Sequence, residues 1–453
     1  MDHSQLTLAA LQSDAPPRPD EAGLWPDKAA LRQACADALT HLDVAPDAAL
    51  DMFWVPGRVE VLGKHTDYAG GHSLLIASDQ GFIMAARARA DNMVRIRAAQ
   101  RQETAVFAVT PELAPQMGTW SNYPMTVARR LARNFTAPPL RGADIAFAGD
   151  LPPAAGMSSS SALMIATYLV LATINELDQR PAHRAAVTTP LQLAEYLGTV
   201  ENGQSYGPLP GDKGVGTFGG SEDHTAILTC TPGVISRYAF APSRFEVDAP
   251  APAGYVFAIG VSGVVAEKTG NARDLYNRAS ALAAAVTTTW NTATGRDDRH
   301  MAAILAACDG DPAPLRAVLD AANHGTFTAA QLRRRFDHFY VEHAEIIPAA
   351  TDALLRGDVA GFGAAANASQ QQGAALLGNQ VPETVALASL ATDLGAAGAS
   401  AFGAGFGGSV WALVPQDDAD AFLAGWRARY AQAFPQRAGD FFVTKAGASA
   451  RRL

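Results

Sequence analysis

The stretch Pro56-Gly-Arg-Val-Glu-Val-Leu-Gly-Lys-His-Thr-Asp-Tyr-Ala-Gly-Gly71 combines a strand-like apolar run, turn glycines and five charged or chargeable side chains within sixteen residues. Charged side chains are rarely buried unless they are paired, so core packing alone does not favour such a density of charge. Lys64 stands out further because the whole chain has only five lysines. We therefore interpret this stretch as part of a functional site.

Two other stretches, both rich in small residues, lie far along the chain at Pro152 to Ala162 and at Gly403 to Ser409. The backbone of such loops can approach a ligand closely and hold phosphate oxygens. For Gly403-Ala-Gly-Phe-Gly-Gly408 alone, a simple turn before a strand is the alternative interpretation. Taken together, the three stretches predict a nucleotide-dependent transferase.

The serine cluster Gly156-Met-Ser-Ser-Ser-Ser-Ala162 leads into an apolar stretch, Ser160 to Leu177, that lacks Pro and Gly and predicts a buried helix. Unpaired N–H groups and the positive end of the helix dipole would converge at the serines, which favours a bound phosphate. A hydroxyl there can also ligate Mg²⁺. A serine N-cap without a ligand is the alternative. The P-loop pattern Gly-x-x-x-x-Gly-Lys-Ser/Thr is absent from the sequence, so ATP binding would need another fold.

Length and composition predict a globular chain of two domains. A length of 453 residues exceeds what one hydrophobic core usually organises, and 48% hydrophobic against 17% charged residues is far from a disordered composition. The net charge of −9, with no basic cluster longer than Arg333-Arg-Arg335, argues against a nucleic-acid partner. No apolar run is flanked like a membrane span or signal peptide, so we expect a cytoplasmic protein without a membrane partner. Cys35, Cys230 and Cys308 are widely spaced in apolar surroundings, which is typical of buried reduced thiols.

Hydrophobic patterns along the chain predict an α+β protein. A helix-like segment at 27–42 precedes strand-like segments at 53–55, 59–62 and 76–90. Beyond Asp223 we expect a short strand at 225–228, Ala-rich helices at 273–286 and 301–322, strands at 409–415 and 441–443, and a helix at 418–434. A Pro- and Ala-rich segment at 250–252 places the domain boundary near residues 230 to 255, and we expect domains of 1–240 and 241–453.

Three motifs occur in the order Pro-Gly-Arg-Val-x-x-x-Gly-x-His-Thr-Asp-Tyr, Gly-Met-Ser-Ser-Ser-Ser-Ala-Leu and Gly-Ala-Gly-Phe-Gly-Gly. This combination resembles the GHMP kinases, specifically the galactokinases, and Trp120-Ser-Asn-Tyr123 resembles a further galactokinase element. The similarity runs from about Phe53 to the C-terminus. The resemblance implies a two-domain GHMP kinase fold, with an N-terminal domain like ribosomal protein S5 domain 2 and a ferredoxin-like C-terminal domain. It also implies that ATP and a sugar meet in the cleft between them.

The resemblance implies two catalytic residues. Asp223 lies in Gly219-Gly-Ser-Glu-Asp-His224, where galactokinases usually carry Gly-x-Met-Asp-Gln, and would accept or orient the proton of the sugar's anomeric hydroxyl. Arg58 would support charge at the reacting centre. If this segment is a strand, Glu222 and His224 point to the face opposite Asp223, so we choose Asp223.

Binding residues follow from the same resemblance. Ser160 and Glu201 would hold Mg²⁺, with a structural serine and a surface glutamate as alternatives. For Tyr276, a role in helix packing is an equally good alternative to the sugar contact given next. The sugar would contact Lys64, His65, Asp67, Gly220 and Tyr276. ATP would contact Trp120, Gly156, Met157, Ser158, Ser159, Ser160, Ser161, Gly405 and Gly407.

The sequence departs from the galactokinase pattern at several positions. Lys64 stands where galactokinases carry a Glu that is implied to bind the sugar's C6 hydroxyl. A cation there could pair with a C6 carboxylate, donate to a neutral sugar's hydroxyl or bridge to a carboxylate such as Asp67. Ser400 and Phe402 replace the Arg and Thr that commonly precede Gly-Ala-Gly, and an insertion at 204–214 lengthens the spacing between Glu201 and Asp223.

These observations lead to one main hypothesis and three alternatives. The main hypothesis is an ATP- and Mg²⁺-dependent kinase of galactose metabolism that phosphorylates the C1 hydroxyl of galactose or a close relative and releases ADP. A uronic acid 1-kinase, recognising a galacturonate-type sugar through Lys64, is a close competitor. A catalytically silent sugar sensor and a kinase for a non-sugar alcohol are the others; the retained acid and arginine argue against the first, and His-Thr-Asp-Tyr argues against the second.

Overall fold

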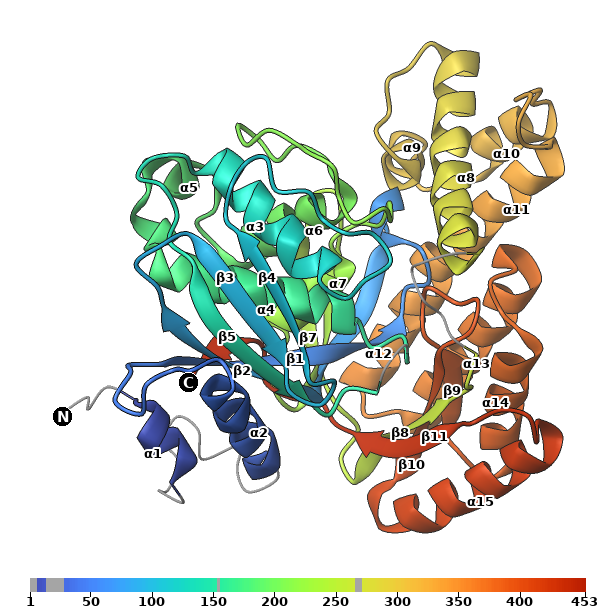
Figure 1. The fold of residues 1–453 in the computed structure, drawn as a ribbon. Helices are drawn as coiled ribbons and strands as arrows, with labels where there is room; N and C mark the ends of the chain where they lie inside the picture. Colours follow the sequence, from blue (N-terminus) through green and yellow to red (C-terminus); the bar gives the residue numbers. More distant parts are fainter. Residues whose placement is uncertain (1–5, 14–27, 153–154, 265–270) are drawn as a thin grey trace.

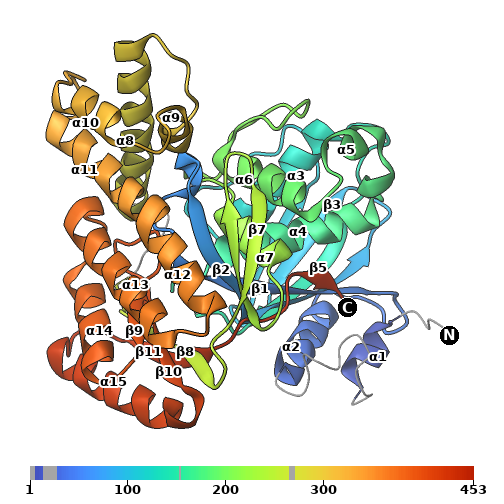
Figure 2. The same ribbon diagram turned by 180° about the vertical axis from the view of Figure 1, so that it is seen from behind.

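The computed structural model describes residues 6–13, 28–152, 155–264 and 271–453. Its larger sheet has the strand order β12-β1-β2-β5-β3-β4, and β6 pairs with both β2 and β7 (Figures 1 and 2). Neighbouring strands are antiparallel except β3 and β5. The strands are β1 (Asp51–Leu62), β2 (His72–Ala88), β3 (Met93–Ala98), β4 (Glu103–Ala108), β5 (Ala143–Gly149), β6 (Val234–Ala239), β7 (Arg244–Pro250) and β12 (Arg451–Arg452).

Both faces of this sheet are covered. Successive side chains of a strand point to opposite faces, so Phe53 and Val55 enter the main core while Trp54 packs with Cys35 of α2 on the other side. One face is covered by α1 (Leu8–Gln12) and α2 (Ala29–Thr40) (Figure 1). The other carries α3 (Asn122–Asn134), α4 (Ser159–Ile174), η3 (Leu177–Gln179), α5 (Pro181–Ala186), α6 (Pro190–Asn202) and α7 (Glu222–Thr229).

A second, four-stranded antiparallel sheet has the order β11-β8-β10-β9. Leu387 and Trp426 pack on one of its faces, whereas Trp411 and Phe362 belong to the cluster that also fills the main core. The two sheets therefore share one continuous core. The elements are β8 (Tyr255–Val261), β9 (Gly398–Ala401), β10 (Ser409–Pro415), β11 (Asp440–Thr444), α12 (Ile347–Leu355), α13 (Val359–Gln372), η5 (Gly373–Leu377), α14 (Pro382–Asp393), η6 (Gln416–Asp418) and α15 (Ala419–Ala433).

A helical arm with its own small core projects beside the large sheet (Figure 2). It contains α8 (Asn271–Thr294), α9 (Met301–Ala307), α10 (Ala313–Asp320), α11 (Ala329–Tyr340) and the following turn η4 (Val341–Ile346). None of the described helices combines the length and the apolar character that crossing a bilayer requires. Cys35 and Cys230 are buried, Cys308 is partly buried, and all three are free thiols.

Most expected elements are confirmed, including the buried helix after the serines, which is α4, and the strand and helix that follow the last glycine stretch, which are β10 and α15. The short strand expected at 225–228 is wrong, because these residues form α7, whose first turn carries two acidic residues that suit a helix N-terminus. The helix expected at 301–322 is divided into α9 and α10, since Gly310 has a φ of +81° and Pro312 follows it.

The chain leaves the large sheet after Pro250 and enters the small sheet at Tyr255, while β12 returns to pair with β1. We keep the division into domains of 1–240 and 241–453 as a proposal.

Candidate active site

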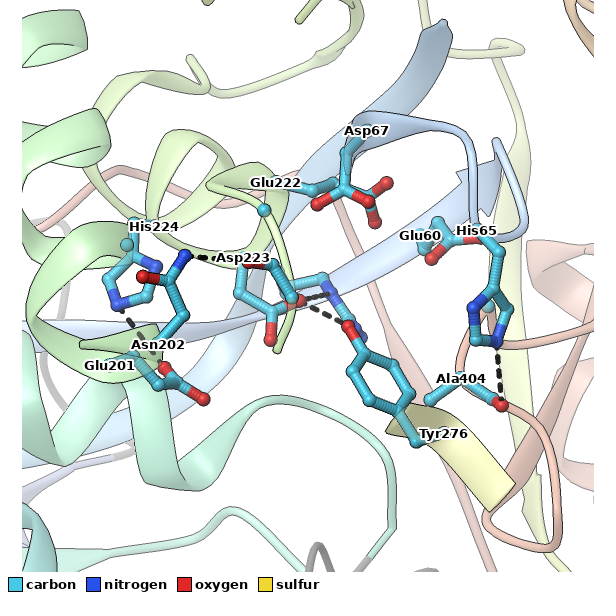
Figure 3. A pocket seen from close by; sticks show the side chains of 15 residues that line it. Glu60, His65, Asp67, Glu201, Asn202, Glu222, Asp223, His224, Tyr276 and Ala404 are labelled. Carbon is cyan, nitrogen blue, oxygen red and sulfur yellow. Dashed lines mark hydrogen bonds and ion pairs between the residues drawn. The ribbon is translucent and has the colours of Figure 1, made fainter. Parts of the chain in front are cut away.

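The first and last of the three remote stretches line one pocket (Figure 3), and the serine stretch adjoins it through hydrogen bonds. The Ser409 hydroxyl donates to the Ala155 carbonyl at 2.6 Å, which joins the last glycine stretch to the serine loop. The Arg58 backbone N–H donates to the Met157 carbonyl at 3.2 Å, which joins the first stretch to the same loop. Pocket-lining side chains come from β1, η2, α6, α7 and α8.

Arg58 and Asp223 form an ion pair at the centre of the site. The Arg58 Nε and one terminal nitrogen each lie 2.8 Å from Asp223 Oδ1, and another nitrogen donates to the Gly156 carbonyl. Burial opposes the charge of Arg58, but the neighbouring carboxyl groups outweigh it, above all Asp223, and raise the pKa of the guanidinium. The pair is thereby fixed against the loop that begins the serine-headed helix.

Ser161 connects Asp223 to Glu201. Its hydroxyl lies 2.8 Å from Glu201 Oε2 and 3.3 Å from Asp223 Oδ2. It is thus Ser161, one residue beyond the predicted Ser160, that contacts the predicted glutamate, since Ser158 begins the helix with a left-handed φ of +57° and sets which serine faces inward. A hydroxyl and a carboxylate are oxygen donors that fit Mg²⁺ beside phosphates. No group of three or more acidic, His or Cys side chains within the described ranges is arranged to hold a metal by itself.

His65 is held in one tautomer. Its Nε2 lies 3.0 Å from the Ala404 carbonyl, which can only accept, so Nε2 carries the proton and Nδ1 accepts from the Tyr68 hydroxyl at 2.6 Å. Burial lowers the pKa of His65 to about 4, so the ring is neutral at physiological pH. The first stretch therefore also contacts the last glycine stretch at Ala404.

Asp67, Gly220 and Tyr276, which the sequence predicts to contact a sugar, all line the pocket. A Cβ on Gly220 would overlap the Asp67 carboxylate, so only glycine permits this close approach. Burial raises the pKa of Asp67 to about 6, and the Asp223 and Glu60 carboxyl groups add to this rise while N–H donors oppose it. The Tyr276 side chain of α8 points into the pocket toward Asp223 (Figure 3).

Lys64 lies outside the pocket lining. It is completely buried, and its Nζ donates to Ser369 and Ser400, each at 2.7 Å. Ser369 in turn donates to Glu342 Oε1 at 2.8 Å, and burial lowers the pKa of Lys64 although Glu342 and Glu60 oppose this. This geometry directs the ammonium group to two serines rather than to Asp67 or into the pocket.

The predicted ATP residues are spread over a wider area. Gly156 has a φ of +74° and lies against Phe402, which precedes the last glycine stretch, and Met157, Ser158, Ser159 and Ser160 continue into the first turn of α4. Gly405 and Gly407 have φ values of +68° and +126°, which only glycine adopts readily. Trp120 lies two residues before α3, donates to Glu103 and packs on Phe147, outside the pocket lining.

Several pocket residues were not predicted from the sequence. The expectation that Glu222 and His224 face away from the site is wrong, because 222–224 is the first turn of a helix and all three of its side chains line the pocket. Glu60 lines it as well, since it follows Arg58 by two residues on β1 and so shares its face. That spacing was the one available signal for Glu60.

Family comparisons match three parts of the chain. Residues 47–88 match the galactokinase galactose-binding signature, residues 122–208 the GHMP kinases N terminal domain and residues 350–432 the GHMP kinases C terminal domain. The galactokinase of Chloroflexus aggregans is 29% identical over 383 residues, which cover 83% of this chain and 87% of that protein. The galactokinase of Enterococcus faecalis is 28% identical over 420 residues, which cover 88% and 95%.

Solved structures show the same fold. The crystal structure of Lactococcus lactis galactokinase complexed with galactose superposes with a TM-score of 0.75 and 22% identity, covering 92% of this chain and 99% of that one. Methanococcus jannaschii mevalonate kinase superposes less closely, with a TM-score of 0.54 and 12% identity over 87% and 98%. The expected two-domain α+β fold of these kinases is thereby confirmed.

Proposed function

Since this chain is a galactokinase-like sugar kinase of the GHMP kinase superfamily, we propose that it transfers the γ-phosphoryl group of ATP to the C1 hydroxyl of galactose or a close relative. The observation that carries this proposal is the placement of Asp223 between Arg58 and the Ser161 hydroxyl. A carboxylate in this position would lie near both reactants, because it borders the pocket proposed for the sugar and also the loop that would hold the phosphates of ATP. As the reaction draws on ATP, we keep the cytoplasm as its expected compartment.

In the proposed reaction, a bond forms between the sugar's C1 oxygen and the γ-phosphorus as the bond from that phosphorus to the β,γ-bridging oxygen breaks. ADP leaves with the electron pair of the broken bond, and the hydroxyl proton passes late to Asp223, because a loose transition state needs no strong base. Arg58 holds the carboxylate in place and offsets charge at the reacting centre. Neutral His65 and the Asp67 carboxylate would orient the sugar through its hydroxyl groups.

Ser161 and Glu201 have the oxygen donors that would hold Mg²⁺, which neutralises phosphate charge when bound. The loop at 156–158 and the start of α4 would receive the phosphates through backbone N–H groups and the helix dipole. Glycines 405 and 407 would let the opposite loop approach the nucleotide.

The uronic acid alternative loses its main support because the Lys64 ammonium is directed to serines 369 and 400. The sensor alternative is disfavoured because the chain retains both Arg58 and Asp223, which a protein that only binds a sugar would not need.

The test is ADP release with ATP and Mg²⁺ in the presence of galactose, galacturonic acid or mevalonate, followed by phosphorus NMR of the product. We expect turnover with galactose and a phosphate on C1. Sugar binding without ADP release would establish the sensor instead, and a phosphate on another oxygen would overturn the proposed position.

A further inference from the structure

Two glutamates lie side by side in the pocket, one from each of two elements. Glu60 projects from β1 and Glu222 from the first turn of α7, and their carboxyl groups are in hydrogen-bonding contact. Both are almost completely buried, with 4% and 5% of their surface exposed. Glu222 Oε2 accepts a hydrogen bond from the Ser73 hydroxyl at 2.7 Å, whereas Glu60 Oε1 has no partner within the described residues. The pair thus lines the pocket and contains a buried acceptor oxygen without a hydrogen-bond partner among the described residues.

The pocket as a whole has more acidic groups than basic ones. The side chains that line it include five carboxyl groups and one guanidinium, Arg58, which is committed to Asp223. Lys64 directs its ammonium group to serines, and His65 is neutral. Figure 3 places Glu60, Asp67 and Glu222 together, and all three line the pocket. Such a wall repels an anionic sugar substituent and attracts a cationic one.

The pair is costly to keep ionised without a cation. Burial raises the pKa of both groups, and the Glu60 carboxyl group raises that of Glu222 further, whereas Arg58 opposes the rise at both groups and Lys64 opposes it at Glu60. A cation placed at this point would let both groups ionise, because buried charges are tolerated when they are paired and hydrogen-bonded.

The chemistry of that cation is restricted. No cluster of three or more metal-binding side chains is present within the described ranges, which disfavours a metal ion. A protonated amine has three donors and could satisfy Glu60 Oε1 together with an oxygen of Glu222.

We propose that the Glu60–Glu222 pair recognises a protonated amine, so that the site takes an amino sugar in preference to the corresponding neutral or acidic sugar. This inference rests on the proposed sugar kinase function and specifies its substrate class. Glu222 stands where galactokinases usually carry Met, so the acidic wall is a property of this chain.

The experiment is a calorimetric titration of the full chain, without nucleotide, by four sugars: galactose, 2-amino-2-deoxygalactose, 6-amino-6-deoxygalactose and galacturonic acid. We expect one of the two amino sugars to bind at least about tenfold more tightly than galactose at pH 7, with galacturonic acid weakest. Two amino sugars are used so that either position of the amine supports the inference. Equal or weaker binding of both amines would overturn it.

Glu222→Met is the decisive variant, and exposed Glu112→Gln is its control for overall charge. Glu222→Met should abolish the preference for the amine, reducing amino sugar affinity by about tenfold more than galactose affinity, because only the amine loses a charged partner. Glu60→Gln should do the same and covers the case in which Glu222→Met does not fold. Equal losses for amine and galactose in both variants would overturn the inference.

Failure of the inference is distinguishable from failure of the proposed function. Binding is measured without ATP, so the preference among sugars is tested whether or not phosphoryl transfer occurs. ADP release in the presence of galactose, without any binding preference for an amino sugar, would support the kinase proposal and overturn the proposed recognition of an amine. A binding preference for an amino sugar, without ADP release in the presence of any sugar, would support recognition of the amine and overturn the kinase proposal.

Discussion

Lys64 Nζ and Ser400 Oγ lie 2.7 Å apart in a fully buried contact that ties the end of β1 to β9 of the small sheet. Both residues depart from the galactokinase pattern, which has Glu at the first position and commonly Arg at the second. The two departures therefore compensate for each other in charge. Ser400 lacks the positive charge that an Arg at this position would have, and Lys64 supplies a positive charge to the same contact. Glu342 balances its charge through Ser369. We infer that Lys64 links the two sheets and takes no part in contacting the sugar.

We predict that Lys64→Glu destabilises the fold by about 3–5 kcal/mol, because it removes a buried cation and adds a carboxylate beside Glu342 and Glu60. Lys64→Met should cost less, and adding Glu342→Gln to Lys64→Met should recover part of the loss by removing the unpaired charge. Urea unfolding midpoints measure these differences. A Lys64→Glu variant with unchanged stability and an altered preference between galactose and galacturonic acid would show instead that Lys64 contacts the sugar.

We predict that Asp223→Asn lowers the turnover number by about 10²–10⁴-fold, as expected for loss of a group that takes a proton. Asparagine keeps an acceptor oxygen for Arg58 and places an N–H donor toward the Ser161 oxygen, so sugar and ATP affinities should change little. Steady-state ADP release and calorimetry check the two halves of this expectation. Exposed Asp393→Asn is the matched control. Retained turnover in Asp223→Asn would remove this residue from the mechanism.

We predict that Ser161→Ala raises the Mg²⁺ concentration for half-maximal activity by at least about tenfold, whereas Ser160→Ala has little effect. The two serines are neighbours in the same turn of α4, so this comparison separates a hydroxyl that touches Glu201 from one that does not. Glu201→Gln should behave like Ser161→Ala. The reverse order of the two serine variants would restore the assignment made from the sequence.

The motifs of the sequence predicted which stretches meet, because a Gly-rich loop and a helix N-terminus have the same chemistry wherever they occur. They did not predict which side chain of a motif faces inward. Ser161 rather than Ser160 contacts Glu201, and the left-handed backbone of Ser158 at the start of the helix is a feature that no residue type requires.

The wrong prediction of a strand at 225–228 has a local cause, and it also affected the predicted site. A short apolar run such as 225–228 is compatible with both a strand and a turn of helix. In the structure these residues pack against the sheet as part of the helix α7. As a result, Glu222 and His224 were placed on the wrong face, and the acidic pair could not be recognised. Lys64 was similarly beyond prediction, because its partners Ser369 and Ser400 lie more than 300 residues away.

We predict that sugar affinity rises with pH through about 6 and then levels off. Burial raises the pKa of Asp67 from its usual value of 3.8 to about 6, so the carboxylate that accepts hydrogen bonds from sugar hydroxyls is lost as the pH falls below 6. Glu60 and Asp223 are the acidic neighbours that raise this pKa, and His65 stays neutral throughout because its pKa is about 4.

Calorimetry with galactose from pH 5 to 8 measures this dependence, and Asp67→Asn should flatten it at a reduced affinity. An unchanged slope in Asp67→Asn would assign the titration to another group.

We predict that Gly403→Ala disturbs both the fold and the sugar site, because a Cβ at this position would overlap the Glu60 carboxylate. The φ of Gly403 lies outside the left-handed region, so alanine meets no backbone strain and the whole effect comes from this contact. Overpacking of this kind costs about 1–3 kcal/mol, since the buried Glu60 side chain has little room to move.

The double variant Gly403→Ala with Glu60→Ala should regain the wild-type urea midpoint without regaining amino sugar affinity. Recovery of neither property would mean that the loop at 403–408 responds to the substitution directly, and recovery of both would mean that Glu60 does not contact the sugar.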